Sequence, residues 1–442
     1  TLIYTKYFTT VGVFSVRNMI MWQLKIYPKT PGYVLEQQKN CLEIEEYLSH
    51  REKAERNAVT GILSGKNVIL ILMESLDDWM IGEHTPAIQY LMNNGINFTN
   101  VYTPLYGGIR TFNTEFCINT GSFLSSQGGY AFDYITNAYP QSLPNLLRNL
   151  GYSAMTFHFN GPDFYSRGEF SPVIGYDRYV YYAEYLNWDT EENSQISSAA
   201  LDSDDLVLFD YDGLNDLFFR KDGPKLNFVI TNAAHLPYTY DNAGSQFGFQ
   251  KHPEFFGATG NEEQDCAFVK AKLLDDFYQR LLQELESHGE LDNTVIIGIT
   301  DHYTYGYNDT EALLKLSKVE EKILLEKTPC FIWSADLQAM EVDKVLNTSD
   351  LLPTMLNLLG VESPYDYIGH DAFDINYEGF VPFSNGSWIC GDTAYDSGTK
   401  EYISISGNRQ TVTADFQKEM AEAVQEFIRI NNLILDADYY RS

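Results

Sequence analysis

The sequence is short of basic residues. It has 30 lysines and arginines against 61 aspartates and glutamates, and its formal net charge at pH 7 is −31. A chain with this charge repels a phosphate backbone and offers no basic stripe, which excludes nucleic acid as an expected partner. The surplus of acid is compatible with divalent cations, although it is more often a solvated exterior.

Cysteine is also scarce, and long apolar runs are missing. The five cysteines have no CxxC spacing, which excludes a zinc knuckle and a disulfide framework. No run reaches the ~18 to 20 consecutive apolar residues that a transmembrane helix needs. Repeats and low-complexity segments are absent as well. With 44% apolar and 14% aromatic residues, the composition predicts a folded globular protein.

The chain has no initiator Met, which suggests a fragment of a longer protein or a processed product. Residues 1–30 are rich in aromatic and large apolar side chains interrupted by lysine and arginine. This pattern is typical of an amphipathic segment on a surface, either a membrane interface or the chain's own domain. Residues 34–60 are charged, with apolar residues at helical spacing, and predict a linker helix that ends near Gly61 and Gly65.

Five apolar runs of strand length follow the linker. They are 67–74, 152–159, 227–235, 294–302 and 329–335, and helical patterns such as 268–289 lie between them. Near-continuous apolar strands that alternate with amphipathic helices indicate an α/β fold, with a mostly parallel central sheet covered by helices on both faces. In such sheets, ligands bind at the carboxyl ends of the strands.

The pattern changes again towards the end of the chain. Residues 384–407 contain short strands of alternating polarity with glycine and asparagine turns, and 413–435 form an amphipathic helical pattern. We therefore predict three parts: a helical linker over 1–60, a main domain over 61–375, and a small α+β subdomain over 376–442.

Three of the apolar runs end in side chains that commonly bind metals. One run ends in Glu74, another in Asp301 and His302, and a third in His235. Carboxylate oxygens and imidazole nitrogens suit Mn²⁺, Mg²⁺ or Zn²⁺. Each residue alone is typical of a loop or a helix cap. Together, at the carboxyl ends of separate buried strands, they predict a metal site.

The segment GGIRTFNTEF, residues 107–116, supplies a nucleophile for that site. Thr111 would act if the glycine-rich loop before it folds towards the same edge, because a metal-bound hydroxyl loses its proton far more easily than a free one. Arg110 would then shield negative charge on a phosphoryl or sulfuryl oxygen. Thr114 is the rival nucleophile, since spacing alone does not separate the two threonines.

These residues resemble the extracellular domain of lipoteichoic acid synthases and related phosphoglycerol transferases, within the sulfatase and alkaline phosphatase superfamily. The resemblance covers nearly the whole chain. Its collinear segments are KNVILILMES, GIRTFNTEF, TFHFNGPDFYSRGEF, NAAHLPY, ITDHYTYG and SDLLPTMLNLLG. It implies a sulfatase-like catalytic domain over 61–375, after a juxtamembrane linker.

The resemblance also implies roles for single residues. It implies that Thr111 is the nucleophile and that one Mn²⁺ ion, with Mg²⁺ as the alternative, is bound by Glu74, Thr111, Asp301 and His302. Tyr165 stands where the family often has tryptophan, and Asn160 where an acid is common. Together with Arg110, the expected substrate contacts are Arg167, His235, Tyr165, His158 and Asn160.

The activity implied by the resemblance is a transfer of glycerophosphate. The donor is phosphatidylglycerol or a related lipid, the intermediate is a covalent phosphothreonine, and the acceptor is a polyglycerolphosphate chain or a glycolipid. The expected location is the outer side of the cell membrane of a Gram-positive bacterium.

Other functions remain open from the sequence. A phosphoethanolamine transferase or a two-zinc phosphodiesterase would need a second set of aspartate and histidine ligands. A non-catalytic module that binds glycerophosphate polymers is an alternative of another class. A sulfatase is disfavoured, because its nucleophile is a modified cysteine or serine and position 111 is threonine.

Overall fold

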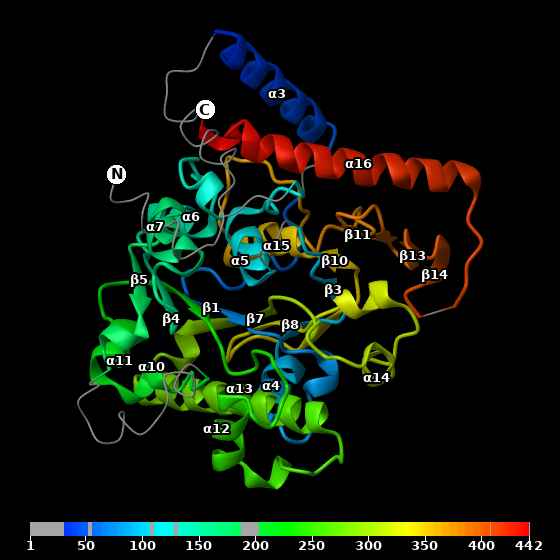
Figure 1. Cartoon of the computed structure of the whole chain (residues 1–442). Coiled ribbons are helices and arrows are strands. Elements are labelled where there is room, and N and C mark those ends of the chain that lie inside the picture. The colour runs from blue at the N-terminus through cyan, green and yellow to red at the C-terminus, as the bar shows by residue number, and fades with distance from the viewer. Residues whose placement is uncertain are drawn as a thin grey trace, which may run out of the picture.

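The structure is a computed structural model that describes residues 31–51, 55–106, 110–127, 131–186, 203–406 and 408–441. Within these ranges the chain forms an eight-stranded sheet, a two-stranded sheet and a four-stranded sheet, with helices packed around them (Figure 1). The amphipathic segment 1–30 and the glycine-rich loop at 107–109 lie outside the described residues.

The eight-stranded sheet has the order β5-β4-β6-β1-β7-β8-β2-β9. Its strands from β5 to β7 pair in parallel, β8 runs antiparallel to both of its neighbours, and β2 pairs in parallel with β9. The prediction of a mostly parallel sheet is confirmed, and the apolar run 329–335 contains the one reversed strand, β8. The strands are β1 Asn67–Met73, β2 Ile96–Phe98, β4 Ser153–His158, β5 Arg178–Tyr181, β6 Lys225–Ile230, β7 Thr294–Thr300, β8 Cys330–Trp333 and β9 Met340–Val342.

Strand β1 lies in the middle of the sheet and is buried on both faces. Val68, Leu70 and Leu72 belong to one core, and Ile69 and Ile71 belong to the other. Because successive side chains of a strand point to opposite faces, an unbroken apolar run is what a strand with two covered faces requires.

Helices cover the two faces of the sheet (Figure 1). The first core contains residues of α5, α6, α7 and α15, and the second contains residues of α4, α10, α11, α12, α13 and α14. The bounds are α4 Pro86–Asn93, α5 Arg110–Thr120, α6 Leu143–Asn149, α7 Arg167–Val173, α10 Val207–Asp210, α11 Asp212–Phe218, α12 Ala243–Lys251, α13 Glu262–Ser287, α14 Thr310–Leu316 and α15 Leu351–Leu359.

The C-terminal part is a four-stranded antiparallel sheet followed by a long helix, as the sequence predicted. The helix also packs against α3, the helix of the linker (Figure 1). A parallel pair, β3 with β10, lies outside the large sheet. The bounds are β3 Val101–Tyr102, β10 Leu346–Asn347, β11 Phe380–Pro382, β12 Trp388–Cys390, β13 Thr393–Asp396, β14 Glu401–Ser404, α3 Pro31–Ser49 and α16 Ala414–Asp436.

The linker helix ends earlier than predicted. Helix α3 stops at Ser49, and residues 58–65 form turns rather than helix. After Leu48 the sequence has few apolar side chains to bury, and a helix without a packed apolar face is marginal in water. Arg51 instead donates to the Tyr367 carbonyl oxygen at 2.6 Å, which ties the chain to the main domain.

Candidate active site

Glu74, Asp301 and His302 converge at the carboxyl ends of two adjacent strands. Glu74 directly follows β1, while Asp301 and His302 directly follow β7, the parallel neighbour of β1. Their ligand atoms all lie within 4.8 Å of one another, and none of the three residues is more than 3% exposed. The structure therefore brings these three predicted residues together, and their role as cation ligands remains a prediction.

Ser75 links the two carboxylates. Its φ of 51° lies in the left-handed region, which is uncommon for a residue other than glycine. In this conformation its N–H donates to Asp301 Oδ1 at 2.8 Å, and its hydroxyl donates to Glu74 Oε1 at 2.8 Å. The turn after β1 therefore fixes the spacing of both carboxylates through one residue with an uncommon backbone conformation.

The charges of this cluster suit a cation. His302 Nε2 lies 3.0 Å from Asp301 Oδ2 and 3.6 Å from Glu74 Oε1. Asp301 Oδ2 is buried and finds no well-directed hydrogen bond among the described residues. Two buried carboxylates and an imidazole around one point form a donor set that Mn²⁺, Mg²⁺ or Zn²⁺ would fit.

The pKa shifts of Glu74 and His302 indicate that the cluster favours a positive charge. Burial raises the pKa of Glu74, and the charge of Asp301 adds to this rise. Burial alone would lower the pKa of His302, but the charges of Asp301 and Glu74 raise it to about 9. The cluster therefore retains a proton on its imidazole, at a point where a cation would provide the same compensation.

Thr111 lies beside this cluster, at the start of α5. The helix begins at Arg110, and the Thr111 hydroxyl lies 3.4 Å from Glu74 Oε2. Thr114 is fully buried, and its hydroxyl donates to the Asp301 carbonyl oxygen at 2.5 Å. Thr111 is therefore the partly exposed hydroxyl next to the carboxylates, whereas the hydroxyl of Thr114 is already engaged by the backbone.

Arg110 lies on the His302 side of the cluster. Its guanidinium carbon is 3.4 Å from the centroid of the Tyr305 ring, and this ring meets the His302 ring edge-on with 4.7 Å between centroids. Arg110 itself is exposed. The aromatic ring therefore restrains a solvent-accessible positive charge at the start of the helix that carries Thr111.

Arg167, the first residue of α7, is held by a buried carboxylate that we did not predict. Glu115 Oε2 accepts a hydrogen bond from Arg167 Nε at 2.9 Å and pairs with Nη2 at 2.9 Å. Burial raises the pKa of Glu115, and the guanidinium opposes that rise. Arg167 Nη1 is buried and makes no hydrogen bond to any described residue. One edge of the guanidinium is therefore available to an anion.

Tyr165 covers Arg167. The guanidinium carbon lies 4.9 Å from the centroid of the Tyr165 ring and 5.7 Å from that of Phe164. Tyr165 and Ser166 are both left-handed, with φ values of 55° and 56°. Two consecutive residues in this region are costly, and such strain persists mainly where the surroundings impose it, as at ligand-binding sites.

His158, the last residue of β4, offers a hydrogen-bond acceptor. Its Nδ1 lies 2.8 Å from the Ile230 carbonyl oxygen, so this nitrogen carries the proton. Burial, reinforced by Arg167, lowers the pKa of His158 well below its usual value, which keeps the imidazole neutral. Its Nε2 is buried without a hydrogen bond in the described part of the chain. This nitrogen can therefore accept from a substrate hydroxyl.

Asn160 and His235 are placed differently from the residues above. The backbone carbonyl of Asn160 accepts a hydrogen bond from the Tyr179 hydroxyl at 2.7 Å, and its contact with substrate remains a prediction. His235 is exposed and is not one of the three clustered ligand residues. His235 lies five residues beyond the end of β6, and its charge acts on Glu74. A substrate contact by His235 also remains a prediction.

Two buried residues that contact predicted site residues were missed from the sequence. Glu115 lies four residues after Thr111 and so on the same side of the helix. Ser75 directly follows a predicted ligand.

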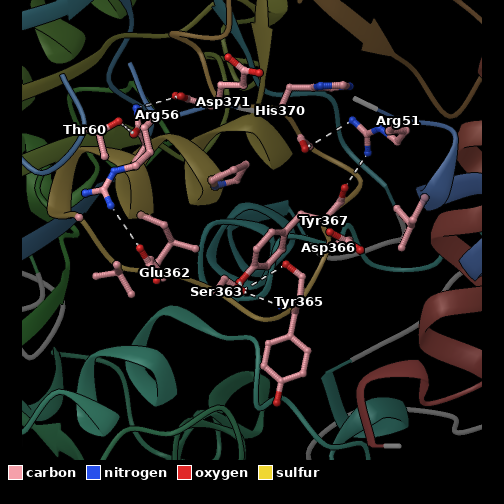
Figure 2. Close-up of a pocket in the computed structure, with 18 residues that line it drawn as sticks. Arg51, Arg56, Thr60, Glu362, Ser363, Tyr365, Asp366, Tyr367, His370 and Asp371 are labelled. Atoms are coloured by element: carbon pink, nitrogen blue, oxygen red, sulfur yellow. Dashed lines mark hydrogen bonds and ion pairs between the residues drawn. The ribbon is translucent and has the colours of Figure 1, made fainter. Parts of the chain in front are cut away.

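A cavity of about 290 Å³ lies elsewhere, between the end of α3, the segment before β1 and the end of α15 (Figure 2). In Figure 2, Arg51 points to the backbone next to Tyr367, and Arg56 pairs with Glu362. None of the predicted site residues lines this cavity. It belongs to the attachment of the linker and not to the strand-end cluster.

Comparison with known proteins decides the family. The sulfatase family profile matches residues 66–361, which is more than half of the chain. The chain belongs to the sulfatase family. The matched segment of this sulfatase-family chain includes every predicted site residue, from Glu74 to His302.

Two relatives are lipoteichoic acid synthases. The chain is 25% identical over 415 residues to lipoteichoic acid synthase 2 of Bacillus subtilis (strain 168), covering 90% of this chain and 61% of that protein. It is 26% identical over 437 residues to lipoteichoic acid synthase of Staphylococcus aureus (strain USA300), covering 92% of this chain and 62% of that protein. The chain therefore spans about three fifths of the length of these curated relatives.

A solved structure has the same fold. The crystal structure of the lipoteichoic acid synthase LtaP from Listeria monocytogenes superposes with a TM-score of 0.74 at 19% identity, covering 90% of this chain and 98% of that one. The sulfatase-like architecture predicted from the sequence is thereby confirmed. Among the described helices, none has the length and apolar character needed to cross a membrane.

Proposed function

We propose that this chain is the catalytic part of a phosphoglycerol transferase, which moves glycerophosphate from phosphatidylglycerol to a polyglycerolphosphate or glycolipid acceptor. The observation that carries the proposal is the Thr111 hydroxyl 3.4 Å from Glu74 Oε2, in a cluster with Asp301 and His302. The similarity to lipoteichoic acid synthases supports this substrate class.

Glu74, Thr111, Asp301 and His302 would hold one divalent cation, for which we propose Mn²⁺, with Mg²⁺ as the alternative. When bound, the cation would favour loss of the hydroxyl proton of the nucleophile and neutralise charge on the phosphoryl group. Asp301 Oδ2, which is buried without a well-directed hydrogen bond in the described part of the chain, and the short distances within the cluster support this arrangement.

In the first step, Thr111 Oγ1 attacks the phosphorus of phosphatidylglycerol. A P–O bond to Thr111 forms, and the P–O bond to the diacylglycerol oxygen breaks. The threonine hydroxyl gives its proton to solvent, and His235 gives a proton to the departing diacylglycerol oxygen. A glycerophospho-threonine remains on the enzyme, with the free Arg167 Nη1 donating to a phosphoryl oxygen.

In the second step, an acceptor hydroxyl attacks the phosphorus from the side that diacylglycerol has left. It gives its proton to His235, and the P–O bond to Thr111 breaks as the threonine oxygen regains a proton. His158 Nε2 accepts a hydrogen bond from a glycerol hydroxyl throughout. Most of the rate acceleration in this kind of transfer comes from positioning and charge neutralisation.

The donor is a membrane lipid, so the enzyme works at a membrane surface. We propose that the full-length protein is tethered to the cell membrane with this chain on the outer side, as in a Gram-positive cell. Added protease should digest the chain on intact cells expressing the full-length protein. Protection from that protease would contradict the proposed location.

Turnover of a fluorescent phosphatidylglycerol in vesicles tests the function. The full-length, membrane-tethered protein should release fluorescent diacylglycerol in the presence of Mn²⁺, and Thr111→Ala should abolish release. Thr111→Ser, which keeps a hydroxyl, should retain part of the activity, and Thr114→Ala should retain a measurable fraction. Binding of glycerophosphate polymer without any turnover would favour a non-catalytic module instead.

Metal analysis separates the remaining enzyme alternatives. One tightly bound Mn²⁺ or Mg²⁺ per chain supports the proposed transferase. Two bound Zn²⁺ ions, with turnover of phosphatidylethanolamine or a simple phosphodiester, would favour a phosphoethanolamine transferase or a phosphodiesterase.

A further inference from the structure

Lys270 is a buried charge that the mechanism above does not use. It lies in α13, the long helix that packs against the second face of the sheet, and it is 1% exposed. A lysine in such a place is expected to pair with a carboxylate, because burying an unpaired ammonium is costly. Within the described ranges, no carboxylate oxygen lies within 4.0 Å of Lys270 Nζ.

Its partners all come from one loop. Lys270 Nζ donates to the carbonyl oxygen of His235 at 2.5 Å, to that of Pro237 at 3.0 Å and to the side-chain oxygen of Asn242 at 3.0 Å. An ammonium group has three N–H donors, and the three contacts use all of them. The ammonium therefore fixes the backbone on both sides of Leu236.

The ring of His235 is tied to the same short segment. Its Nδ1 lies 2.5 Å from the Leu236 carbonyl oxygen, so Nδ1 is the nitrogen that carries a proton in this contact. Lys270 therefore binds the carbonyl oxygens of His235 and Pro237, and the carbonyl oxygen between them, that of Leu236, orients the imidazole. Tyr238 also restrains this segment, because its hydroxyl donates to the Ala234 carbonyl oxygen at 3.2 Å.

The arrangement costs free energy. Burial lowers the pKa of Lys270 to about 8, from 10.5 for an exposed lysine. Neutral dipoles compensate an ammonium less well than a carboxylate does, so an apolar residue here would suit the core better. All three N–H donors of the Lys270 ammonium bind the 235–242 loop. A buried charge that costs free energy is explained if it is needed to hold this loop in one position.

We propose that Lys270 is a positioning residue that holds His235 in the orientation needed for proton exchange with the substrate oxygens. This inference rests on the proposed function for the role of His235, but the contacts themselves do not. Loss of the Lys270 ammonium should misplace His235 and leave Glu74, Asp301 and His302 in place, since none of the hydrogen bonds of Lys270 Nζ involves these residues. The ammonium acts on Glu74 through its charge alone.

The chain offers a matched control two residues away. Lys272 lies on the same helix and pairs with Asp275 at 3.1 Å and with Asp276. Lys272→Met removes the same charge from α13 without touching the 235–242 loop. Lys270→Met and Lys270→Gln are the test variants, and the glutamine, which keeps two N–H donors, serves if the methionine variant does not fold.

The first arm of the experiment needs no turnover. Histidine side chains are labelled with ¹³C at Cε1, and the NMR signal of His235 is assigned from the His235→Ala variant. Removal of the Lys270 ammonium should shift or broaden the His235 signal, and Lys272→Met should leave it unchanged. An unaltered His235 signal in both Lys270 variants would overturn the proposal, whether or not the chain is a phosphoglycerol transferase.

The second arm is a double-mutant cycle on kcat/KM with fluorescent phosphatidylglycerol. Lys270→Met should lower kcat/KM by about 10- to 100-fold without weakening Mn²⁺ binding, since the ammonium that it removes carries a positive charge that acts on Glu74. In the His235→Ala background the same substitution should cause little further loss, because it acts through His235. Fully additive losses would contradict positioning. If the wild-type protein has no turnover but the His235 signal shifts in the Lys270 variants, the proposed function is refuted and the role of Lys270 in positioning His235 still holds.

Discussion

The proposed cation ligands and the proposed substrate contacts lie at the same edge of the sheet, but they are held in different ways. Glu74, Asp301 and His302 directly follow β1 and β7, and Ser75 joins their carboxylates by two hydrogen bonds of 2.8 Å. Arg167 and His235 lie beyond their strands, and each depends on one buried residue of a distant helix, Glu115 or Lys270. Glu74, Asp301 and His302 are therefore positioned by the ends of two paired strands, and Arg167 and His235 by helices packed beside them.

This difference implies that the two groups can be damaged separately. A change in the strand-end turns should remove the cation and, with it, all chemistry. A change at Glu115 of α5 or at Lys270 of α13 should misplace a substrate contact without weakening cation binding. Substitutions can therefore be ordered by how much of the site they remove.

The largest effect is expected from the ligands themselves. Asp301→Asn and His302→Ala should each weaken Mn²⁺ binding by more than about 100-fold and abolish diacylglycerol release, because the donor set is incomplete. Far-UV circular dichroism should stay unchanged, since these residues end a strand and do not form the apolar core. Metal content by mass spectrometry checks the prediction. Wild-type stoichiometry in both variants would remove these residues from the cation site.

Glu115→Gln is the sharpest test of the separation between the two groups. The amide keeps a hydrogen-bond acceptor for Arg167 but loses the charge that orients the guanidinium, so kcat/KM should fall by about 10- to 100-fold. Mn²⁺ affinity by calorimetry should remain within twofold of wild type. A matching loss of Mn²⁺ affinity would show that substrate contacts and cation ligands are one interdependent unit.

Ser75→Ala should have a smaller effect, and this effect should be on Mn²⁺ affinity. It removes the hydroxyl that donates to Glu74 Oε1 but keeps the N–H that donates to Asp301, so Mn²⁺ affinity should fall by about tenfold. Ser334→Ala is the control, because this buried serine donates to the Thr294 carbonyl oxygen at the opposite end of β7. Equal Mn²⁺ affinity in the two variants would contradict the role given to Ser75.

The smallest effect on activity is expected at His370, which lines the cavity near the linker. Burial, with Arg51 and Lys344 nearby, lowers the pKa of His370 to about 3. The unfolded chain, with an ordinary pKa near 6.5, therefore binds a proton that the folded chain does not, and stability falls as pH drops below about 6.5. Between pH 7.5 and 5.0 this residue should cost about 2 kcal/mol.

Urea unfolding of wild type and His370→Phe at the two pH values measures that cost. The variant, whose ring can still stack on Tyr377 as the imidazole does at 4.1 Å, should lose less stability on acidification. Its Mn²⁺ affinity and kcat/KM at pH 7.5 should match wild type, which confirms that the cavity is separate from both parts of the site. The same loss of stability in both proteins would exclude His370 as the source.

The sequence predicted what depends on local pattern. Strand β1 was visible because two covered faces demand an unbroken apolar run, and Glu74 because it ends that run. The shortest strands were not visible: β2, β9 and β11 each have three residues, too few for a periodic signal. The linker helix was extended too far because charged residues after Leu48 were read as an amphipathic surface.

The supporting residues of the site were missed for a different reason. Lys270 looks like any helical lysine, and its meaning appears only when α13 packs beside the loop after β6. The spacing of Glu115 to Thr111 places it on the same side of α5, but its pairing with Arg167 depends on how α7 packs beside α5. Residues that act through a packed neighbour leave no local pattern, so the substrate side of the site was less predictable than the ligand side.

Intact-mass analysis of trapped enzyme tests the central claim most directly. Full-length protein is incubated with phosphatidylglycerol and Mn²⁺ without acceptor, quenched in acid and digested for peptide mapping. We expect glycerophosphate on the peptide that contains Thr111, with the modified oxygen assigned to Thr111 by fragmentation and no adduct in Thr111→Ala. An adduct on Thr114, or turnover of the donor by Thr111→Ala, would contradict the account.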